Sequence, residues 1–328
     1  MDVTRIYQRK DWNALSEKEA TAILTFLTET QLPEFSIRSF ERFSKFNQHT
    51  FTVVLDYKGS EFVFVPGDTV TLGLNEYPMT SANKEQLAAL NGTTPTETDE
   101  WLQARLSPLR TVTIAPMIVE RYAQETGYLP VSPDDGRLVS DKYFKQALND
   151  LLNSSREKYA YTVNNSFRLN KDGQDITAFL YQPATYDELV ADVANNGFRL
   201  PTEDEWEYLC GGGSRTIFPW GNEIDPTKKY RHFAADHHPD EPFFLDTFNH
   251  FGIVIANNPY HYEITMDSEW FLKAGDGGCN ICGGSGLELG YLSAGTYYRD
   301  PYIFDEEMNY KEEIAGEYTY RRRLKRLL

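Results

Sequence analysis

The sequence predicts an α+β fold in which small mixed or antiparallel sheets and few helices are joined by extensive irregular loops. β-rich runs separated by turn residues begin at Thr50, whereas segments with helical spacing of apolar residues are short. Glycines cluster at residues 211–213, 275–278 and 283–286, and compact domains keep long loops mainly for function. Twenty Phe, 21 Tyr and 5 Trp against only 5 Met indicate loops pinned by aromatic packing and not a helical bundle.

Length and charge limit the classes of function. The chain has 328 residues, enough for one large domain or two, and a formal net charge of −17. Because this charge repels phosphate backbones, we predict no nucleic-acid binding through the chain as a whole. No run approaches the ~20 apolar residues that span a bilayer, and the first residues lack the apolar core of a secretory signal. With only three cysteines and no disulfide framework, we expect a cytoplasmic protein that does not bind membranes.

Residues 1–50 are predicted to form a helical N-terminal extension, followed by the main domain at residues 51–328. Ser16 is a candidate N-cap, and the apolar residues after it recur with helical spacing. A second short helix is expected after Pro33, with an apolar side made of Phe35, Ile37, Phe40 and Phe43.

The main domain begins with strands. The β-rich runs on either side of Lys58-Gly59 predict a hairpin, and the polar stretch Glu76–Glu100 predicts an exposed insertion. Strand character returns at residues 110–122.

Later elements are mixed. Residues 141–155 have one apolar side and predict a helix, and residues 161–179 predict a strand pair that turns at Lys171-Asp172-Gly173. Beyond Gly211 regular elements become scarce.

The most specific segment, residues 197–213, predicts a short helix. Thr202 is a good N-cap, and Glu205, three residues later, completes a capping box. Arg199 precedes the cap and is placed to hold carboxylates through bidentate contacts. One face of the helix carries Trp206, Leu209 and Cys210. By themselves these features predict a structural helix with a buried tryptophan.

This segment, together with Phe218–Glu223, resembles the formylglycine-generating enzyme family, also called the sulfatase-modifying factors. The family's hallmark is an Arg-Leu-Pro-Thr-Glu run, a Glu-Trp-Glu-Tyr helix, a glycine-rich turn and Pro-Trp-Gly. Looser similarities occur in FVFVPGDTVTLG, RTVTIAPMIVERY, ATYDELVADVANNGFRLP, FNHFGI and EITMD. The resemblance covers roughly Asp56 to Leu328 and implies a C-type-lectin-like fold.

The resemblance also implies a chemistry. Enzymes of this family bind copper(I) through two cysteines, activate oxygen and convert a substrate cysteine to formylglycine, and soft thiolates suit copper(I). Cys279 and Cys282 are therefore the candidate catalytic and copper-binding residues. One register aligns residues 273–279 with the family's Lys-Gly-Gly-Ser-Tyr-Met-Cys, which puts Cys279 on the first copper cysteine. The second copper cysteine would then fall at Gly284, and Asp276 would replace the family's serine.

A second register stays open. It places Gly283-Gly284-Ser285 on the Gly-Gly-Ser of noncatalytic members, so that Cys282 replaces their arginine. Two thiols three positions apart also suit another soft metal or a redox pair, although a lone C-x-x-C is weak evidence for zinc.

Calcium is a second candidate ion. The family's second calcium sits at a Gly-Asn-x-Trp-Glu-Trp turn, and this chain has NNPYHYEIT there. Asn258 and Glu263 supply oxygens of the type that a hard cation requires. Pro259 and the loss of both tryptophans argue against an unchanged site.

Histidines and a basic tail complete the candidates. Five histidines fall within thirty residues and raise an iron or zinc hypothesis: His232, His237, His238, His250 and His261. Ergothioneine-type relatives of the family bind iron through a separate histidine-rich helical domain, but residues 1–50 contain only His49, so that subfamily is disfavoured. We expect the five histidines to be solvated loop residues. The last residues, YRRRLKRLL, carry five basic groups and predict a strand end with a solvated tail; docking onto an acidic surface of the protein or of a partner is the alternative.

The sequence therefore predicts a formylglycine-generating-enzyme-like domain with a degenerate active site. We favour a noncatalytic binding or interaction module that holds a protein or peptide partner. The alternative is a copper-dependent oxidase that converts a peptidyl cysteine to formylglycine through Cys279 and Cys282. No cofactor is assigned firmly; copper(I) at the cysteine pair and calcium at Asn258 and Glu263 are the candidates.

Overall fold

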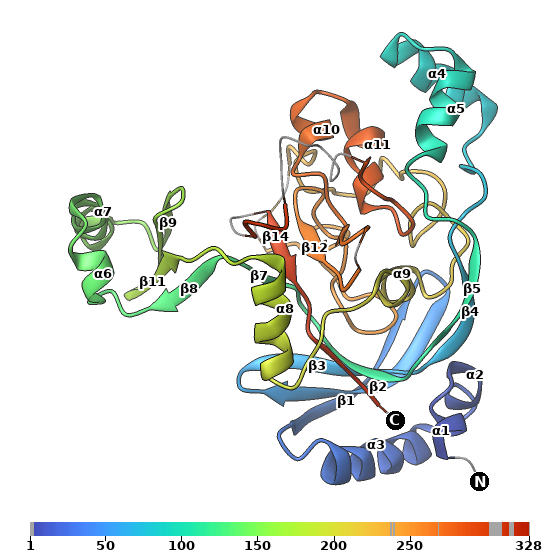
Figure 1. Ribbon diagram of the computed structural model, residues 1–328, viewed down its shortest axis with the longest axis horizontal. Coiled ribbons are helices and arrows are strands. Elements are labelled where there is room, and N and C mark those ends of the chain that lie inside the picture. Colours follow the sequence, from blue (N-terminus) through green and yellow to red (C-terminus); the bar gives the residue numbers. More distant parts are fainter. Residues whose placement is uncertain are drawn as a thin grey trace.

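A five-stranded antiparallel sheet forms the base of the molecule (Figure 1). The computed structural model describes residues 3–236, 238, 240–267, 269–301, 310–314 and 318–327. In spatial order, the strands of this base sheet are β1 (Ser36–Lys45), β2 (Gln48–Tyr57), β3 (Ser60–Val65), β6 (Met117–Glu120) and β15 (Leu324–Arg326). Strands from both ends of the chain therefore lie in one sheet.

Both faces of the base sheet are buried, which explains why its central strands are almost continuously apolar. Successive side chains of a strand point to opposite faces. The face that packs against helix α3 (Glu17–Gln31) presents Val53, Leu55, Phe62, Phe64 and Ile118. The face that packs against helix α9 (Glu203–Gly211) and the later loops presents Val54, Val63, Val65, Met117 and Val119.

The second helix expected in the N-terminal extension is wrong. Ser16 does cap α3, as predicted, and the structure adds a capping box with Glu19. Residues 36–45, however, form strand β1, which pairs with β2 from Ser36↔Asp56 to Lys45↔Gln48. The link between them, Phe46-Asn47, has φ of 55° and 60°, the left-handed conformation of a tight hairpin turn. Pairing with β2 supplies the ladder hydrogen bonds, so tertiary context overrides the helix-like spacing of the apolar residues.

Two further antiparallel strand pairs follow β1 and β2, and an insertion lies between the strands of the second pair. The predicted turn at Lys58-Gly59 is confirmed between β2 and β3. Strands β4 (Asp68–Leu72) and β5 (Arg110–Ile114) then form a two-stranded sheet. The polar stretch between them is helical and projects from the body at the upper right of Figure 1 as α4 (Ser81–Asn91) and α5 (Pro95–Gln103).

Residues 128–181 form a separate lobe that projects to the left in Figure 1. The predicted helix and strand pair are both confirmed in this lobe. Its small apolar core lies between α7 and one face of its sheet. The sheet has the order β8-β11-β10-β9. The elements of the lobe are β8 (Tyr128–Val131), α6 (Gly136–Val139), α7 (Lys142–Asn153), β9 (Lys158–Val163), β10 (Phe167–Asp172) and β11 (Asp175–Tyr181).

A third small sheet supports the loops that carry the candidate site. Its order is β13-β12-β14-β7, and β12 and β14 are parallel. Its strands are β7 (Gln124–Glu125), β12 (Tyr262–Ile264), β13 (Leu272–Lys273) and β14 (Thr319–Arg321). The remaining helices are α1 (Val3–Ile6), α2 (Arg9–Trp12), α8 (Tyr186–Asn195), α10 (Cys279–Cys282), α11 (Gly286–Gly290) and a 3₁₀ turn at Leu292–Ala294.

Irregular structure dominates the second half of the chain. Among the described residues between α9 and β12 there is neither a helix nor a strand. None of the described helices is long and apolar enough to cross a bilayer. The predicted α+β class, with small sheets and long loops, is confirmed.

Candidate functional site

Helix α9 carries the hallmark segment and begins as predicted. Glu205 N–H donates to Thr202 Oγ1 at 3.3 Å, and Thr202 N–H donates to Glu205 Oε2 at 2.8 Å, which completes the capping box. Gly212, with φ of 58°, ends the helix. The predicted inner face is buried, including Trp206. Among the described residues, Arg199 contacts one carboxylate and not several: Arg199 Nη1 donates to Glu205 Oε1 at 3.0 Å.

A buried charge network ties α9 to the cysteine loop, here defined as residues 273–286. Lys273 Nζ lies 3.0 Å from Glu207 Oε1 and 3.3 Å from Glu203 Oε1, and it donates to the Tyr298 carbonyl at 2.7 Å. The side chains of Lys273 and Glu207 have no exposed surface.

Two arginines complete this network. Arg110 Nη2 lies 3.0 Å from Glu207 Oε2, and Arg299 makes two hydrogen bonds to Glu203 at 2.8 and 2.6 Å. Burial acts to raise the pKa of Glu203, but Lys273 and Arg299 together lower it to about 2. Burial raises the pKa of Glu207 above its usual value. Lys273 therefore compensates two buried acids at the start of the cysteine loop.

Close packing against Tyr260 shapes the cysteine loop. Gly278 has φ of 81°, and a Cβ there would lie 2.2 Å from the Tyr260 ring, so this position requires glycine. The buried Asp276 orders the next turn: its carboxylate accepts from Gly278 N at 2.8 Å and from Asn280 Nδ2 at 2.7 Å. Asp276 N–H in turn donates to the Pro259 carbonyl at 3.0 Å.

Cys279 and Cys282 are the first and last residues of α10, and both are free and exposed. Residues three apart on a helical turn are neighbours, so the structure brings the two thiols to the same side of the loop. Cys282 Sγ lies 3.1 Å from the Tyr260 hydroxyl, a contact that raises the pKa of Tyr260 to about 12. The third cysteine, Cys210, is buried in α9.

Two buried carboxylates set the electrostatics around Cys279. Burial raises the pKa of Asp276 to about 6. Burial, and then the negative charges of Asp276 and Asp300, raise the pKa of the Cys279 thiol above its usual value. Asp300 is itself fixed by the Tyr262 hydroxyl, which donates to its Oδ2 at 3.1 Å. At neutral pH this surrounding favours the thiol over the thiolate.

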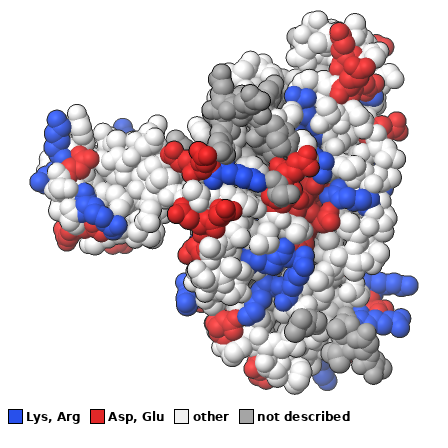
Figure 2. Space-filling model, viewed as in Figure 1, with Lys and Arg blue, Asp and Glu red and all other residues white. Residues whose placement is uncertain are grey.

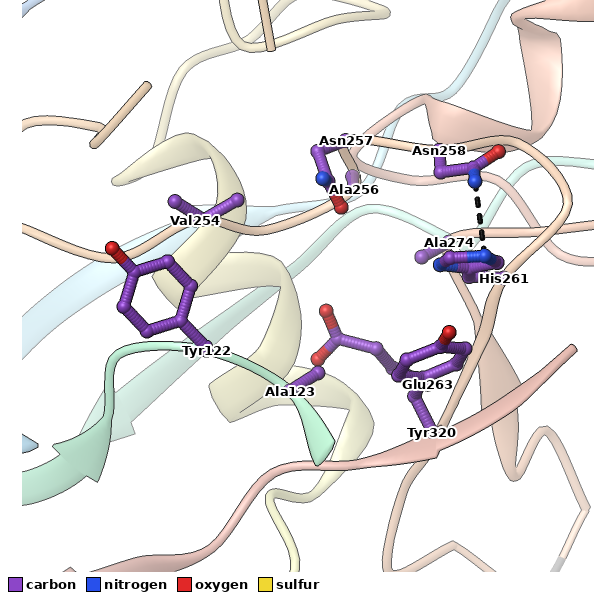
Figure 3. A pocket seen from close by; sticks show the side chains of 10 residues that line it. All are labelled: Tyr122, Ala123, Val254, Ala256, Asn257, Asn258, His261, Glu263, Ala274 and Tyr320. Carbon is purple, nitrogen blue, oxygen red and sulfur yellow. Dashed lines mark hydrogen bonds between the residues drawn. The ribbon is translucent and has the colours of Figure 1, made fainter. Parts of the chain in front are cut away.

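The candidate calcium ligands line one small cavity of about 150 Å³ (Figure 3). Asn258 Nδ2 donates to His261 Nε2 at 2.9 Å, and Asn258 Oδ1 accepts from Tyr260 N and His232 Nε2, both at 3.1 Å. The Glu263 carboxylate points away from the Asn258 side chain and accepts hydrogen bonds from Trp206 and Arg322.

These residues do not fit a calcium ion. The Asn258 oxygen and both Glu263 oxygens already accept hydrogen bonds from protein groups. In the part of the chain that the structure describes, no three His, Cys, Asp or Glu side chains are grouped to hold a metal. Asn258 and Glu263 therefore line the same cavity, but they do not form a set of ligands for one ion.

The expectation of solvated histidines is wrong for His250. Only 1% of His250 is exposed, and burial lowers its pKa to about 3, so it is neutral. His261 is half-buried, whereas His232 and His238 are exposed as expected; His232 and His261 both hydrogen-bond to the Asn258 side chain. His237 lies outside the described residues.

The predicted strand end is confirmed as β15, but the basic residues of the tail are only partly solvated, because they pair with acids of the same chain. Arg322 is buried against Glu263, and three further pairs are Arg323–Glu120, Lys325–Glu34 and Arg326–Glu205. The sequence signal was the apolar Leu324 between basic residues, which marks the inward position of strand β15. Figure 2 shows the same mixture over the body of the molecule, where acidic and basic side chains lie side by side.

A larger cleft, of about 540 Å³, lies next to the cysteine loop between the lobe and the body. One wall is a sheet face of the lobe that includes Thr162, Arg168 and Asn170. Arg168 is held there by two hydrogen bonds to Glu125. The other wall is largely aromatic and is formed by His232, Asn258, Tyr260, His261, Tyr318 and Tyr320. Sequence reasoning missed this cleft, because strands and loops far apart in the chain build it.

Known proteins resemble this chain over a continuous part of its length. Residues 38–252 match the Sulfatase-modifying factor enzyme 1-like domain of the FGE-sulfatase family. A formylglycine-generating enzyme of Bos taurus is 30% identical over 125 residues, which are 35% of this chain and 33% of that relative. The aligned part thus spans about a third of the bovine protein.

Shorter matches include both active and inactive names. A formylglycine-generating enzyme of Mus musculus is 47% identical over 51 residues, 15% of this chain and 13% of that protein. An "Inactive C-alpha-formylglycine-generating enzyme 2" of Bos taurus is 40% identical over 45 residues, 13% of this chain and 15% of that protein. On the match over residues 38–252, which is more than half of its length, this chain belongs to the sulfatase-modifying factor family of formylglycine-generating-enzyme-like proteins.

Proposed function

We propose that this chain is a noncatalytic member of its family that binds a protein or peptide partner. The surrounding of Cys279 carries the proposal. Copper(I) binds thiolates, and loading a cysteine site requires the thiols to lose their protons. Burial and the charges of Asp276 and Asp300 hold the pKa of Cys279 above its usual value, which opposes that loss. Names of relatives include inactive proteins, which fits a noncatalytic role.

The cleft beside the cysteine loop is the surface we assign to the partner. Tyrosines are enriched at protein interfaces because they combine a large apolar ring with a polar tip. Tyr318 is 43% exposed, and its ring lies 5.9 Å from that of Tyr260. Since the opposite wall is a sheet face, the cleft suits an extended peptide that lies between the two.

Peptide selection tests this assignment. Random peptides displayed on phage are selected on the whole chain, and the affinity of the selected peptides is then measured for the wild type and for Tyr318→Ala. Loss of a central aromatic contact should weaken binding at least tenfold. Tyr143→Ala is the matched control, because Tyr143 is 58% exposed on α7 and does not line the cleft. Equal affinity for the two variants, or no selected binder, would argue against the cleft.

A copper-dependent oxidase is the second candidate, and the position of both cysteines on one turn of α10 favours it. Copper(I) titration of the wild type and Cys279→Ala decides between the two functions. The noncatalytic proposal expects no tight, cysteine-dependent binding and no conversion of a peptidyl cysteine to an aldehyde by mass spectrometry. Tight binding that Cys279→Ala abolishes, with aldehyde formation in the presence of oxygen, would establish the oxidase.

A further inference from the structure

Arg322 is a fully buried cation surrounded by oxygen atoms. No part of it is exposed, and its side chain contacts β6 of the base sheet and β12 of the small sheet β13-β12-β14-β7. Arg322 Nε and Nη2 donate to the two oxygens of Glu263 at 3.0 and 2.9 Å. Arg322 Nη2 also donates to the Val254 carbonyl, and Nη1 donates to the Glu120 carbonyl, both at 2.7 Å. One guanidinium thus contacts four oxygens from three segments of the chain.

These oxygens are of the kind that a hard cation prefers. Ca²⁺ takes carboxylate and backbone carbonyl oxygens as ligands. Here the same chemical types point at a planar guanidinium, which matches a carboxylate with two parallel hydrogen bonds. Trp206 Nε1 donates to Glu263 Oε2 at 3.2 Å and provides the carboxylate with one further hydrogen bond. Arg322 therefore supplies the positive charge that the buried Glu263 requires.

We infer that Arg322 takes the place of a bound metal cation at the Glu263 turn, so that this part of the fold carries its own cation and does not depend on calcium. The other candidate ligand agrees, because His232, Tyr260 and His261 already bind the Asn258 side chain. A cation supplied by Arg322 helps to hold the fold together, whether or not the cysteine pair is catalytic.

The wild-type protein gives the first test. Its melting temperature is measured with excess Ca²⁺ and with a chelator, and Tb³⁺ luminescence is excited through tryptophan, since Trp206 contacts Glu263. We expect the same melting temperature in both solutions and no luminescence that depends on Glu263. A saturable Tb³⁺ signal, or a calcium-dependent rise in melting temperature, would overturn the inference if Glu263→Gln abolished it.

Arg322→Ala gives the second test. Removing the guanidinium leaves a buried carboxylate uncompensated, and we expect the melting temperature to fall by roughly 5–15 °C. Ca²⁺ should raise the melting temperature of this variant, because the same oxygens then lack a cation. The double variant Arg322→Met/Glu263→Gln should recover part of the loss and ignore calcium.

A second arginine of the basic tail, Arg326, provides the matched control. Arg326→Ala removes a half-exposed arginine that also binds a glutamate, and it should change the melting temperature by far less. An Arg322→Ala variant that melts like the wild type, or that shows no response to calcium, would contradict the inference. If Arg322→Ala does not fold, the double variant and the wild-type measurement still decide.

Discussion

Replacing Lys273 by methionine should destabilise the protein strongly, because Lys273 is the buried counter-charge of two acids. Its ammonium lies 3.0 Å from Glu207 and 3.3 Å from Glu203, with no exposed surface. Methionine keeps much of the side-chain volume but removes the charge and the hydrogen bond to the Tyr298 carbonyl.

The expected loss follows from what remains around the two acids. Breaking a buried ion pair by removing one partner costs ~3–5 kcal/mol. Here Arg299 still holds Glu203 through two hydrogen bonds, and Arg110 still lies 3.0 Å from Glu207. We therefore expect the low end of that range, about 3 kcal/mol of unfolding free energy.

The loss should also depend on pH. Burial already raises the pKa of Glu207 in the folded protein, and removing Lys273 raises it further. A carboxyl whose folded pKa lies above its unfolded pKa binds more protons in the folded state, so stability falls as pH rises from the unfolded value to the folded one. Lys273→Met should therefore cost less near pH 5 than at pH 8.

Urea unfolding followed by circular dichroism at both pH values measures these effects. Lys325→Met is the matched control, since Lys325 and Glu34 form a pair that is about one-third exposed and should contribute at most ~1 kcal/mol. The double variant Lys273→Met/Glu207→Gln should be more stable than Lys273→Met alone. Equal losses for Lys273→Met and the control, or a loss that does not change with pH, would refute the reasoning.

Two further predictions concern the cysteine loop. Asp276→Asn removes a negative charge that raises the pKa of Cys279, so iodoacetamide should alkylate Cys279 faster at pH 7.5 than in the wild type, as peptide mass spectrometry can show; an unchanged or slower rate would contradict the assigned charge effect. Gly278→Ala places a Cβ 2.2 Å from the Tyr260 ring at a φ of 81°, and should lower the unfolding free energy by at least ~1 kcal/mol in the same urea assay, whereas Gly284→Ala, with the same sign of φ but open space, should cost less.

Local sequence signals predicted the elements whose hydrogen bonds and turn geometry involve residues only a few positions apart. The N-cap at Ser16, the capping box at Thr202 and the Lys58-Gly59 turn appear where the sequence predicts them. In each case the hydrogen bonds or the turn geometry come from neighbours in the chain, so spacing alone suffices. Strand β1 did not follow this rule, because its hydrogen-bond partner is β2.

The candidate site divides in the same way. The sequence located the cysteine pair, and the structure keeps both thiols on one exposed turn. It did not predict that Asp300, twenty-one positions after Cys279, would join Asp276 in raising the pKa of that thiol. Charges act through space, and the sequence separation of two residues says little about their distance.

By itself the sequence determined the family, the α+β class and the helix that carries the hallmark motif, since these depend on local spacing and side-chain type. Only the tertiary structure decided where the charged residues lie and which residues they pair with. The basic tail, read along the chain, suggested solvent, yet Arg322 is fully buried and pairs with Glu263, fifty-nine residues away. Burying a charge is so costly without a partner that the partner, and not the local sequence, fixes where the charged residue lies.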